Sequence, residues 1–224
     1  MTVEAVETAT TDSSSRPLLR GVLHQAALAV AVAVGFVFVA ETDGSRRTVA
    51  AAVFAGSAVT MLALSAIYHR VTWSPRARLR MRRVDHAGIY ILIAGTYTPV
   101  GLLALHGALQ KVVLAVVWAG AAVAIVLKVA WVHAPKWWSA AIAIFLGWVG
   151  VAAIPQVVHA DGVAPVVLIA AGGGAYTIGG VVYARRKPDP IPTVFGYHEL
   201  FHAFTLVGLG LQYAAIAFFG VRAT

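Results

Sequence analysis

The chain consists of long apolar runs separated by short polar loops. After a polar, Ser/Thr-rich stretch at residues 1–15, seven apolar segments follow, at roughly 21–40, 49–69, 86–105, 110–131, 138–158, 164–184 and 197–219. Each segment is close to the about 20 residues that a helix needs to cross the hydrocarbon core of a bilayer. The pattern therefore predicts an all-α membrane protein, a bundle of seven transmembrane helices within residues 16–224.

Proline and glycine refine this prediction. Pro99 is expected to kink the third segment, and Pro155 interrupts the fifth. The sixth segment contains glycines at 172–174 and 179–180. Small residues at such spacing let helices approach closely in lipid, so the sixth segment is predicted to be a crowded central helix.

Composition agrees with membrane insertion and excludes several classes of protein. Hydrophobic residues make up 60% of the chain and charged residues 12%, and the mean hydropathy is +0.81. A soluble domain would be nearer half apolar and a quarter charged. The chain has no cysteine, which excludes disulfides and thiolate metal ligands. The net charge of +8 comes from basic residues in short loops, which indicates anionic lipid headgroups rather than nucleic acid.

Lysine and arginine predict the orientation. With seven spans, one side of the membrane carries 12 basic residues and the other carries 4, while Lys128 lies near the end of the fourth segment. This bias places the N-terminus in the cytoplasm and the C-terminus outside. The arginines between residues 76 and 83 are interpreted as a loop that sets topology and contacts lipid. Residues 1–15 are expected to form a disordered cytoplasmic tail.

The last apolar segment begins with a polar run, His198-Glu199-Leu200-Phe201-His202. Two histidines four residues apart share one face of a helix, about 6 Å apart along its axis, which suits two ligands of one zinc ion. The run also fits the His-Glu-x-x-His pattern of metal hydrolases. Ionisable side chains are costly inside a membrane, so their presence there suggests function.

Two further segments place polar residues at the same depth. The second segment ends with Ser65 and His69, which share a helical face, and the third begins near Asp85. With the predicted topology, these groups and the histidine pair all lie near the cytoplasmic surface. Three neutral imidazoles and a water form a common open zinc site, so Zn²⁺ is the expected metal. Zinc lowers the pKa of a bound water to about 7, and Asp85 or Glu199 could orient that water or take its proton.

Single residues also have simpler interpretations. Asp85 is suited to cap the third helix. His86 lies about 100° around the helix from Asp85, so the two side chains do not easily face one centre. Four isolated histidines are interpreted as polar residues at the headgroups: His24, His106, His133 and His159.

At these residues the chain resembles the hemolysin III family, the bacterial branch of the progestin and adiponectin receptor superfamily. The resemblance rests on residues 65–69 (SAIYH), 85–90 (DHAGIY), 94–99 (AGTYTP) and 196–202 (GYHELFH), and it covers all seven segments. It implies a seven-helix fold with a cytoplasmic N-terminus, in a multi-pass protein of the plasma membrane.

The resemblance also implies a site. Its zinc ligands would be His69, His198 and His202, with Asp85 on the zinc-bound water and Ser65 beside it. Receptor-type relatives can carry Gln at the position of Glu199, which favours Asp85 for the water. Many relatives carry a further His about two turns after the motif, where this chain has Gln212. Gln212 is not expected to bind the metal.

The wider superfamily includes ceramidases and related hydrolases of lipid amides, and the bacterial branch is linked to haemolysis by name and to membrane-lipid homeostasis. The leading hypothesis is therefore a zinc-dependent hydrolase of a lipid amide, with Asp85 and Ser65 as catalytic residues and membrane lipids as environment and substrate class. A metalloprotease with Glu199 as base ranks lower. A non-enzymatic sensor of membrane state with a structural zinc, or a hemolysin-like membrane-active protein, is the alternative.

Overall fold

The computed structural model of the chain describes residues 16–217, so the predicted tail at residues 1–15 and the end of the seventh apolar segment lie outside the described part. Between these limits the chain is helical, apart from loops and an isolated bridge between Ile191 and Phe195. The helices are α2 (Val22–Ala40), α3 (Ser45–Arg70), α4 (Pro75–Pro99), η1 (Val100–Ala104), α5 (Gly107–Ala130), α6 (Lys136–Trp148), η2 (Val149–Ala153), α7 (Ile154–Asp161), α8 (Val163–Arg185) and α9 (Tyr197–Ala215).

Six helical stretches of residues 16–217 are long and apolar enough to cross a membrane: α2, α3, α4 with η1, α5, α6 through α7, and α8. They confirm a multi-pass, all-α membrane protein. The seventh predicted span corresponds to α9, which has 19 residues and is not among those six. Its histidines, Glu199 and Gln212 lower its hydropathy, so the same residues that suggest a site weaken its membrane signal.

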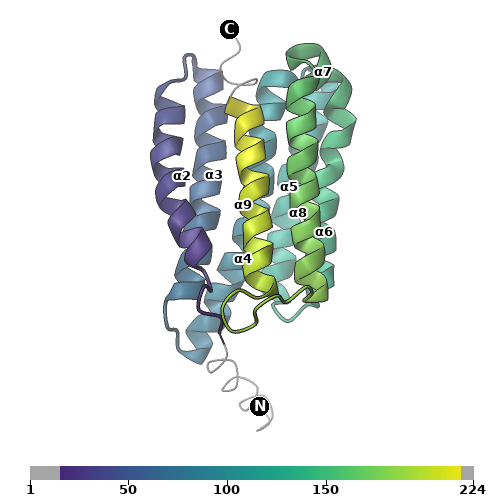
Figure 1. Cartoon of the computed structure of the whole chain (residues 1–224). Helices are drawn as coiled ribbons and strands as arrows, with labels where there is room; N and C mark the ends of the chain where they lie inside the picture. The colour runs from purple at the N-terminus through teal and green to yellow at the C-terminus, as the bar shows by residue number, and fades with distance from the viewer. Residues whose placement is uncertain (1–15, 218–224) are drawn as a thin grey trace.

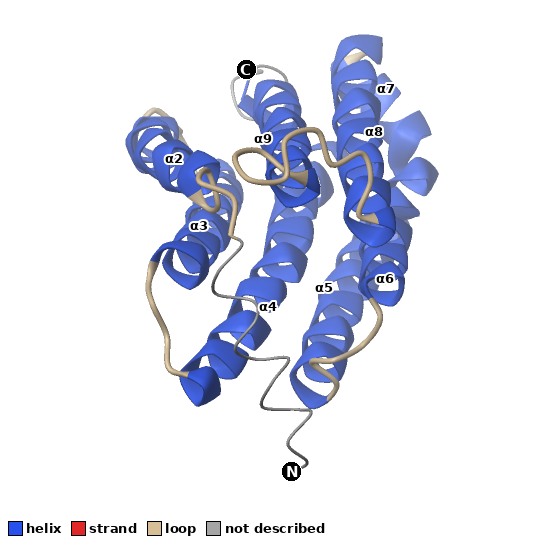
Figure 2. Cartoon of the chain, turned by 60° about the horizontal axis from the view of Figure 1, so that its bottom comes forward, coloured by secondary structure: helices blue, strands red, loops and turns tan. Residues whose placement is uncertain are grey.

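The helices stand side by side as one bundle (Figure 1). Consecutive helices pack together from α2 to α5, α6 packs against α8, and α9 packs mainly against α8 and also against α2. From below, α9 lies between α2 and α8, with the α8–α9 loop crossing in front of it (Figure 2). We call the end of the bundle at which α2 begins, α3 and α5 end, and α9 begins the lower end, as drawn in Figure 1.

Helix α4 begins at Pro75, well before the predicted start near residue 86. Ser74 caps it by accepting a hydrogen bond from the Ala77 amide at 3.4 Å, and Pro75 occupies the first helical turn. The arginines between residues 76 and 83 therefore lie on a helix, and their interpretation as a loop was wrong. Apolar residues mark only the part of a helix that meets lipid or protein interior, and this helix extends beyond that part. Asp85 lies inside α4 and is not its cap.

The helical geometry changes next to both prolines. Helix α4 passes into the π-helix η1 directly after Pro99, and α6 passes into the 3₁₀ segment η2 just before Pro155 in the first turn of α7. Tyr97 joins these two regions, because its hydroxyl donates to the Gly147 carbonyl at 2.6 Å and accepts from the Gly150 amide at 2.7 Å. Backbone groups freed inside a membrane need such partners.

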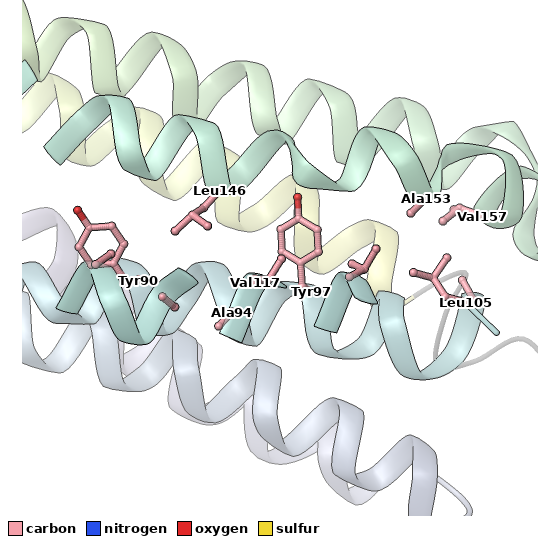
Figure 3. Close-up of a cluster of buried hydrophobic side chains, with 12 residues drawn as sticks. Tyr90, Ala94, Tyr97, Leu105, Val117, Leu146, Ala153 and Val157 are labelled. Atoms are coloured by element: carbon pink, nitrogen blue, oxygen red, sulfur yellow. The ribbon is translucent and has the colours of Figure 1, made fainter. Parts of the chain in front are cut away.

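The main cluster of buried apolar side chains lies between α4, α5, α6 and α7, and Tyr97 stands at its centre (Figure 3). Helix α8 packs closely against α9 and α6, as its glycines predicted, but it is not the central helix of the bundle, because 22% of its most apolar stretch is buried against 50% for α3 and for α4 with η1. A Cβ on Gly179 would lie 2.9 Å from the Cβ of Phe204 on α9, and one on Gly180 would lie 3.3 Å from Ile144 on α6. This packing sets the spacing between α4, α6, α8 and α9, which enclose the cavity described below.

Candidate metal centre

Three histidines come together at the lower end of the bundle. His69 is in the last turn of α3, and His198 and His202 lie one turn apart in the first turns of α9. One ring nitrogen from each lies within 4.8 Å of the other two, and the Nε2 atoms of His69 and His198 are 3.1 Å apart. The three predicted metal ligands therefore form one cluster, although they are 129 residues or more apart between the two helices.

The cluster suits a zinc ion by its chemistry. A tetrahedral ion with Zn–N bonds of about 2.0–2.1 Å needs ligand nitrogens about 3.4 Å apart. The distances between the histidine nitrogens range from 3.1 Å to at most 4.8 Å, so small rotations of the rings would bring all three to that spacing. His198 and His202 are buried, and Nδ1 of His202 has no hydrogen-bond partner among the described residues. Buried imidazole nitrogens without partners are costly, and a metal ligand role would remove that cost.

A fourth histidine, His24 of α2, packs against this cluster. Its ring stacks on His202 with a centroid separation of 3.8 Å and an interplanar angle of 9°. Its Nδ1 lies 2.8 Å from the Ser65 hydroxyl, and the residue is 2% exposed. The interpretation of His24 as an isolated headgroup residue was therefore wrong. His106, His133 and His159, interpreted in the same way, are exposed.

Ser65 and Asp85 are neighbours beside the histidines. The Asp85 carboxyl group of α4 faces the Ser65 hydroxyl of α3, and both residues are buried. A hydroxyl both donates and accepts, so Ser65 can hydrogen-bond to the Asp85 carboxyl group on one side and to Nδ1 of His24 on the other. The predicted residues Ser65 and Asp85 are therefore brought together next to the cluster, in a chain of polar groups from α2 through α3 to α4.

Glu199 is engaged away from the histidine nitrogens. Its side chain is fully buried; one carboxylate oxygen accepts from the Gly196 amide at 2.9 Å, which caps α9, and the other accepts from Nε of Arg20. Both oxygens therefore have partners that hold the start of α9 against the segment before α2. This arrangement favours a structural role for Glu199 over that of a general base, although the local sequence matches a protease motif.

The Glu199→Gln variant tests this structural role. Glutamine keeps an oxygen for the Gly196 amide but loses the ionic partner of Arg20. Because the carboxylate is buried, we expect a loss of about 1–3 kcal/mol in stability, seen as a lower unfolding temperature in detergent. Zinc content per folded chain should match the unsubstituted protein, and Arg20→Gln should have a similar effect. Normal stability combined with lost hydrolysis would instead make Glu199 the base.

A cavity of about 140 Å³ lies next to the histidine cluster, between α4, α6, α8 and α9. Its walls are mostly apolar. Tyr183 and Phe201 line it and also pack against His198, with ring centroids 5.9 Å away in each case. His86 lines the cavity too, so it points away from the Ser65–Asp85 pair, in agreement with its predicted angle around α4. Gln212 lines the same cavity and donates to the Ile169 carbonyl at 3.2 Å.

Comparison with known proteins agrees with the motifs on which the resemblance rests. The family model described as "Haemolysin-III related" matches residues 13–213. The chain belongs to the haemolysin III family. Its relatives include the "Hemolysin-3 homolog" of Bacillus subtilis (strain 168), 29% identical over 186 residues, which are 83% of this chain and 84% of that protein. "Hemolysin-3" of Bacillus cereus is 29% identical over 181 residues, 80% of each chain.

Sequence reasoning missed two groups at the site of this haemolysin III protein. Arg20 comes directly before the first apolar segment and His24 lies near the start of that segment. Both are therefore on the cytoplasmic side of the predicted topology, where Asp85 and the histidine pair also lie. Their shared depth was the available signal. Depth alone does not identify them as site residues, because an isolated histidine or arginine at the end of a span is ordinarily an interfacial residue.

Proposed function

We propose that this haemolysin III protein is a zinc-dependent hydrolase of the plasma membrane that cleaves a lipid amide and contributes to membrane-lipid homeostasis. In this proposal α9 is the seventh membrane span. The lower end of the bundle then faces the cytoplasm with the N-terminus, and the C-terminus lies outside. The basic residues of the lower loops and of the first turns of α4 support this orientation.

One observation carries the proposal. A cluster of three imidazoles, a buried serine–aspartate pair and an apolar cavity adjoin one another within the membrane domain. Three neutral nitrogen ligands leave a position open on a tetrahedral metal, which is the arrangement of catalytic rather than structural zinc. The adjoining cavity suits a molecule with an apolar chain, because its walls come mostly from aliphatic and aromatic side chains.

The residues of the site divide the work. His69, His198 and His202 would hold the zinc, which when bound polarises a carbonyl group and acidifies a coordinated water. Asp85 would accept a proton at a carboxylate oxygen and return it to the leaving amine. Ser65 holds that carboxylate through its hydroxyl, and His24 holds Ser65. Tyr183 and Phe201 line the cavity and pack against His198, and they would limit access of bulk water.

A second function is favoured by a different observation. The cluster joins α3 to α9, and the stacked His24 adds α2, so a bound metal would fasten three helices at one end. In a non-enzymatic sensor of membrane state, such a zinc would be structural. That protein would lose stability on chelation and would release no product from any lipid.

The test is a metal analysis followed by a turnover assay. The full chain, purified in nanodiscs, is expected to hold about one zinc per chain and to release fatty acid from an N-acyl sphingosine or from a bacterial lipid extract. Chelation should stop the release and readdition of zinc should restore it. A zinc-loaded protein that hydrolyses neither substrate would favour the sensor, and a protein that binds no zinc would contradict both.

A further inference from the structure

Lys128, in the last turn of α5, is a buried cation at the lower end of the bundle. Its side chain is 5% exposed, and its Nζ donates to the Ser139 hydroxyl of α6 at 2.9 Å. A lysine near the end of a membrane helix ordinarily extends to the headgroups, and lysine is seldom buried without an ionic partner. The charged group that acts on Lys128 is Arg82, which is another cation. The ammonium group therefore faces the protein interior with a neutral hydroxyl as its hydrogen-bond acceptor.

This lysine contacts a residue in the wall of the apolar cavity. Ser139, which it contacts, lines the cavity, and so does His86 of α4. The Nδ1 atom of His86 is buried and has no hydrogen-bond partner within residues 16–217. The charges that act on His86 come from Lys128, Arg82, His69 and Lys136. A buried imidazole nitrogen that has no hydrogen-bond partner and is surrounded by positively charged groups suits the binding of an anion.

A second lysine strengthens the positive potential at this end. Lys136, the first residue of α6, donates to the Tyr197 hydroxyl at 2.6 Å and lies 4.9 Å from the ring centroid of Tyr183. Tyr183 lines the cavity, so Lys136 stands behind one of its walls. The nearby carboxylate of Asp85 faces Ser65 on α3 and partly offsets this charge from another face of α4.

We propose that the lower end of this cavity binds the anionic headgroup of a lipid-like molecule. Lys128, Ser139 and His86 would contact the headgroup oxygens, and the apolar walls would hold the chain. The apolar lining selects an amphiphile over a free anion, because a small ion would leave that surface without a partner. The inference that this molecule is the substrate rests on the proposed function. Binding of the headgroup requires neither a metal nor turnover.

Binding can be measured on the metal-free full chain. The protein in neutral detergent with chelator is mixed separately with dioleoyl phosphatidylglycerol, dioleoyl phosphatidylcholine and oleate, and bound ligand is counted by native mass spectrometry. Phosphatidylglycerol or oleate should bind at least about tenfold more tightly than phosphatidylcholine, and the preferred arm identifies a phosphate or a carboxylate headgroup. Lys128→Gln should weaken that binding about tenfold, as expected for loss of one charge-assisted contact.

Matched variants keep the test decisive. Lys111 is an exposed lysine at the other end of the same helix, so Lys111→Gln should bind like the unsubstituted protein. Lys128→Arg should keep most of the affinity, and Ser139→Ala provides a second lesion if Lys128→Gln does not fold. Equal uptake of phosphatidylcholine, unchanged binding by Lys128→Gln, or displacement by excess inorganic phosphate would overturn the proposal. Because the assay contains no zinc, these failures are separate from a failure of the hydrolase proposal.

Discussion

Substitution of His69 by alanine is expected to remove zinc from the protein. His69 is the ligand that α3 contributes to the cluster, and the other two come from α9. Loss of an outer-shell partner typically weakens metal binding 10–100-fold, and loss of a direct ligand should exceed about 100-fold. Metal analysis after dialysis against a weak chelator should find less than a tenth of the zinc held by the unsubstituted protein.

Two controls separate ligation from packing. His24→Phe keeps an aromatic ring on His202 but removes the contact with Ser65, so zinc should be retained. His159→Ala alters an exposed histidine remote from the cluster and should have no effect. Normal zinc content in folded His69→Ala would show that the three imidazoles are not the metal site and would remove the basis of the proposed function.

Substitution of Asp85 by asparagine is expected to abolish hydrolysis while the metal stays bound. Asparagine has the shape of aspartate and retains a hydrogen bond with Ser65, but it does not accept a proton as a carboxylate does. General acid–base groups typically contribute 10²–10⁴-fold to a rate, so kcat should fall by about that factor. The measurement is fatty-acid release per zinc-loaded chain, with KM determined in the same assay.

Ser65→Ala tests the same role with a milder change. It leaves the carboxylate in place but removes the hydroxyl that orients it, so a smaller loss of rate is expected than for Asp85→Asn. Full activity in Asp85→Asn would contradict the assignment of the proton-transfer role. If Glu199→Gln were inactive under the same conditions, the protease-like interpretation of the motif would regain support.

The helices of this protein were predictable from the hydropathy pattern, but one important boundary was not. The predicted third span began near residue 86, whereas α4 begins at Pro75 and carries the arginines between residues 76 and 83. Hydropathy reports where a helix meets an apolar environment and does not report where its hydrogen bonds begin. The cap at Ser74 followed by Pro75 was the local signal for the true start.

The site was predictable to the extent that its residues share a depth. Helical spacing paired His198 with His202 and Ser65 with His69, and the loop charges placed these pairs with Asp85 at one end of the bundle. Depth alone did not distinguish Glu199 from Asp85, because both lie near that end. The partners of each carboxylate made the distinction: Gly196 and Arg20 for Glu199, and Ser65 for Asp85.

By itself, the sequence determined the class of protein, the helical segments and the depth of the polar residues, because these depend on composition and on periodicity along a single helix. Only the tertiary structure decided which side chains meet around the bundle. The stacking of His24 on His202 and the inward direction of Lys128 depend on how one helix is rotated against another, and the pairing of Arg20 with Glu199 depends on where the segment before α2 meets the start of α9. That rotation is set by packing between distant segments, such as α9 against α2 and α8, and no local pattern records it.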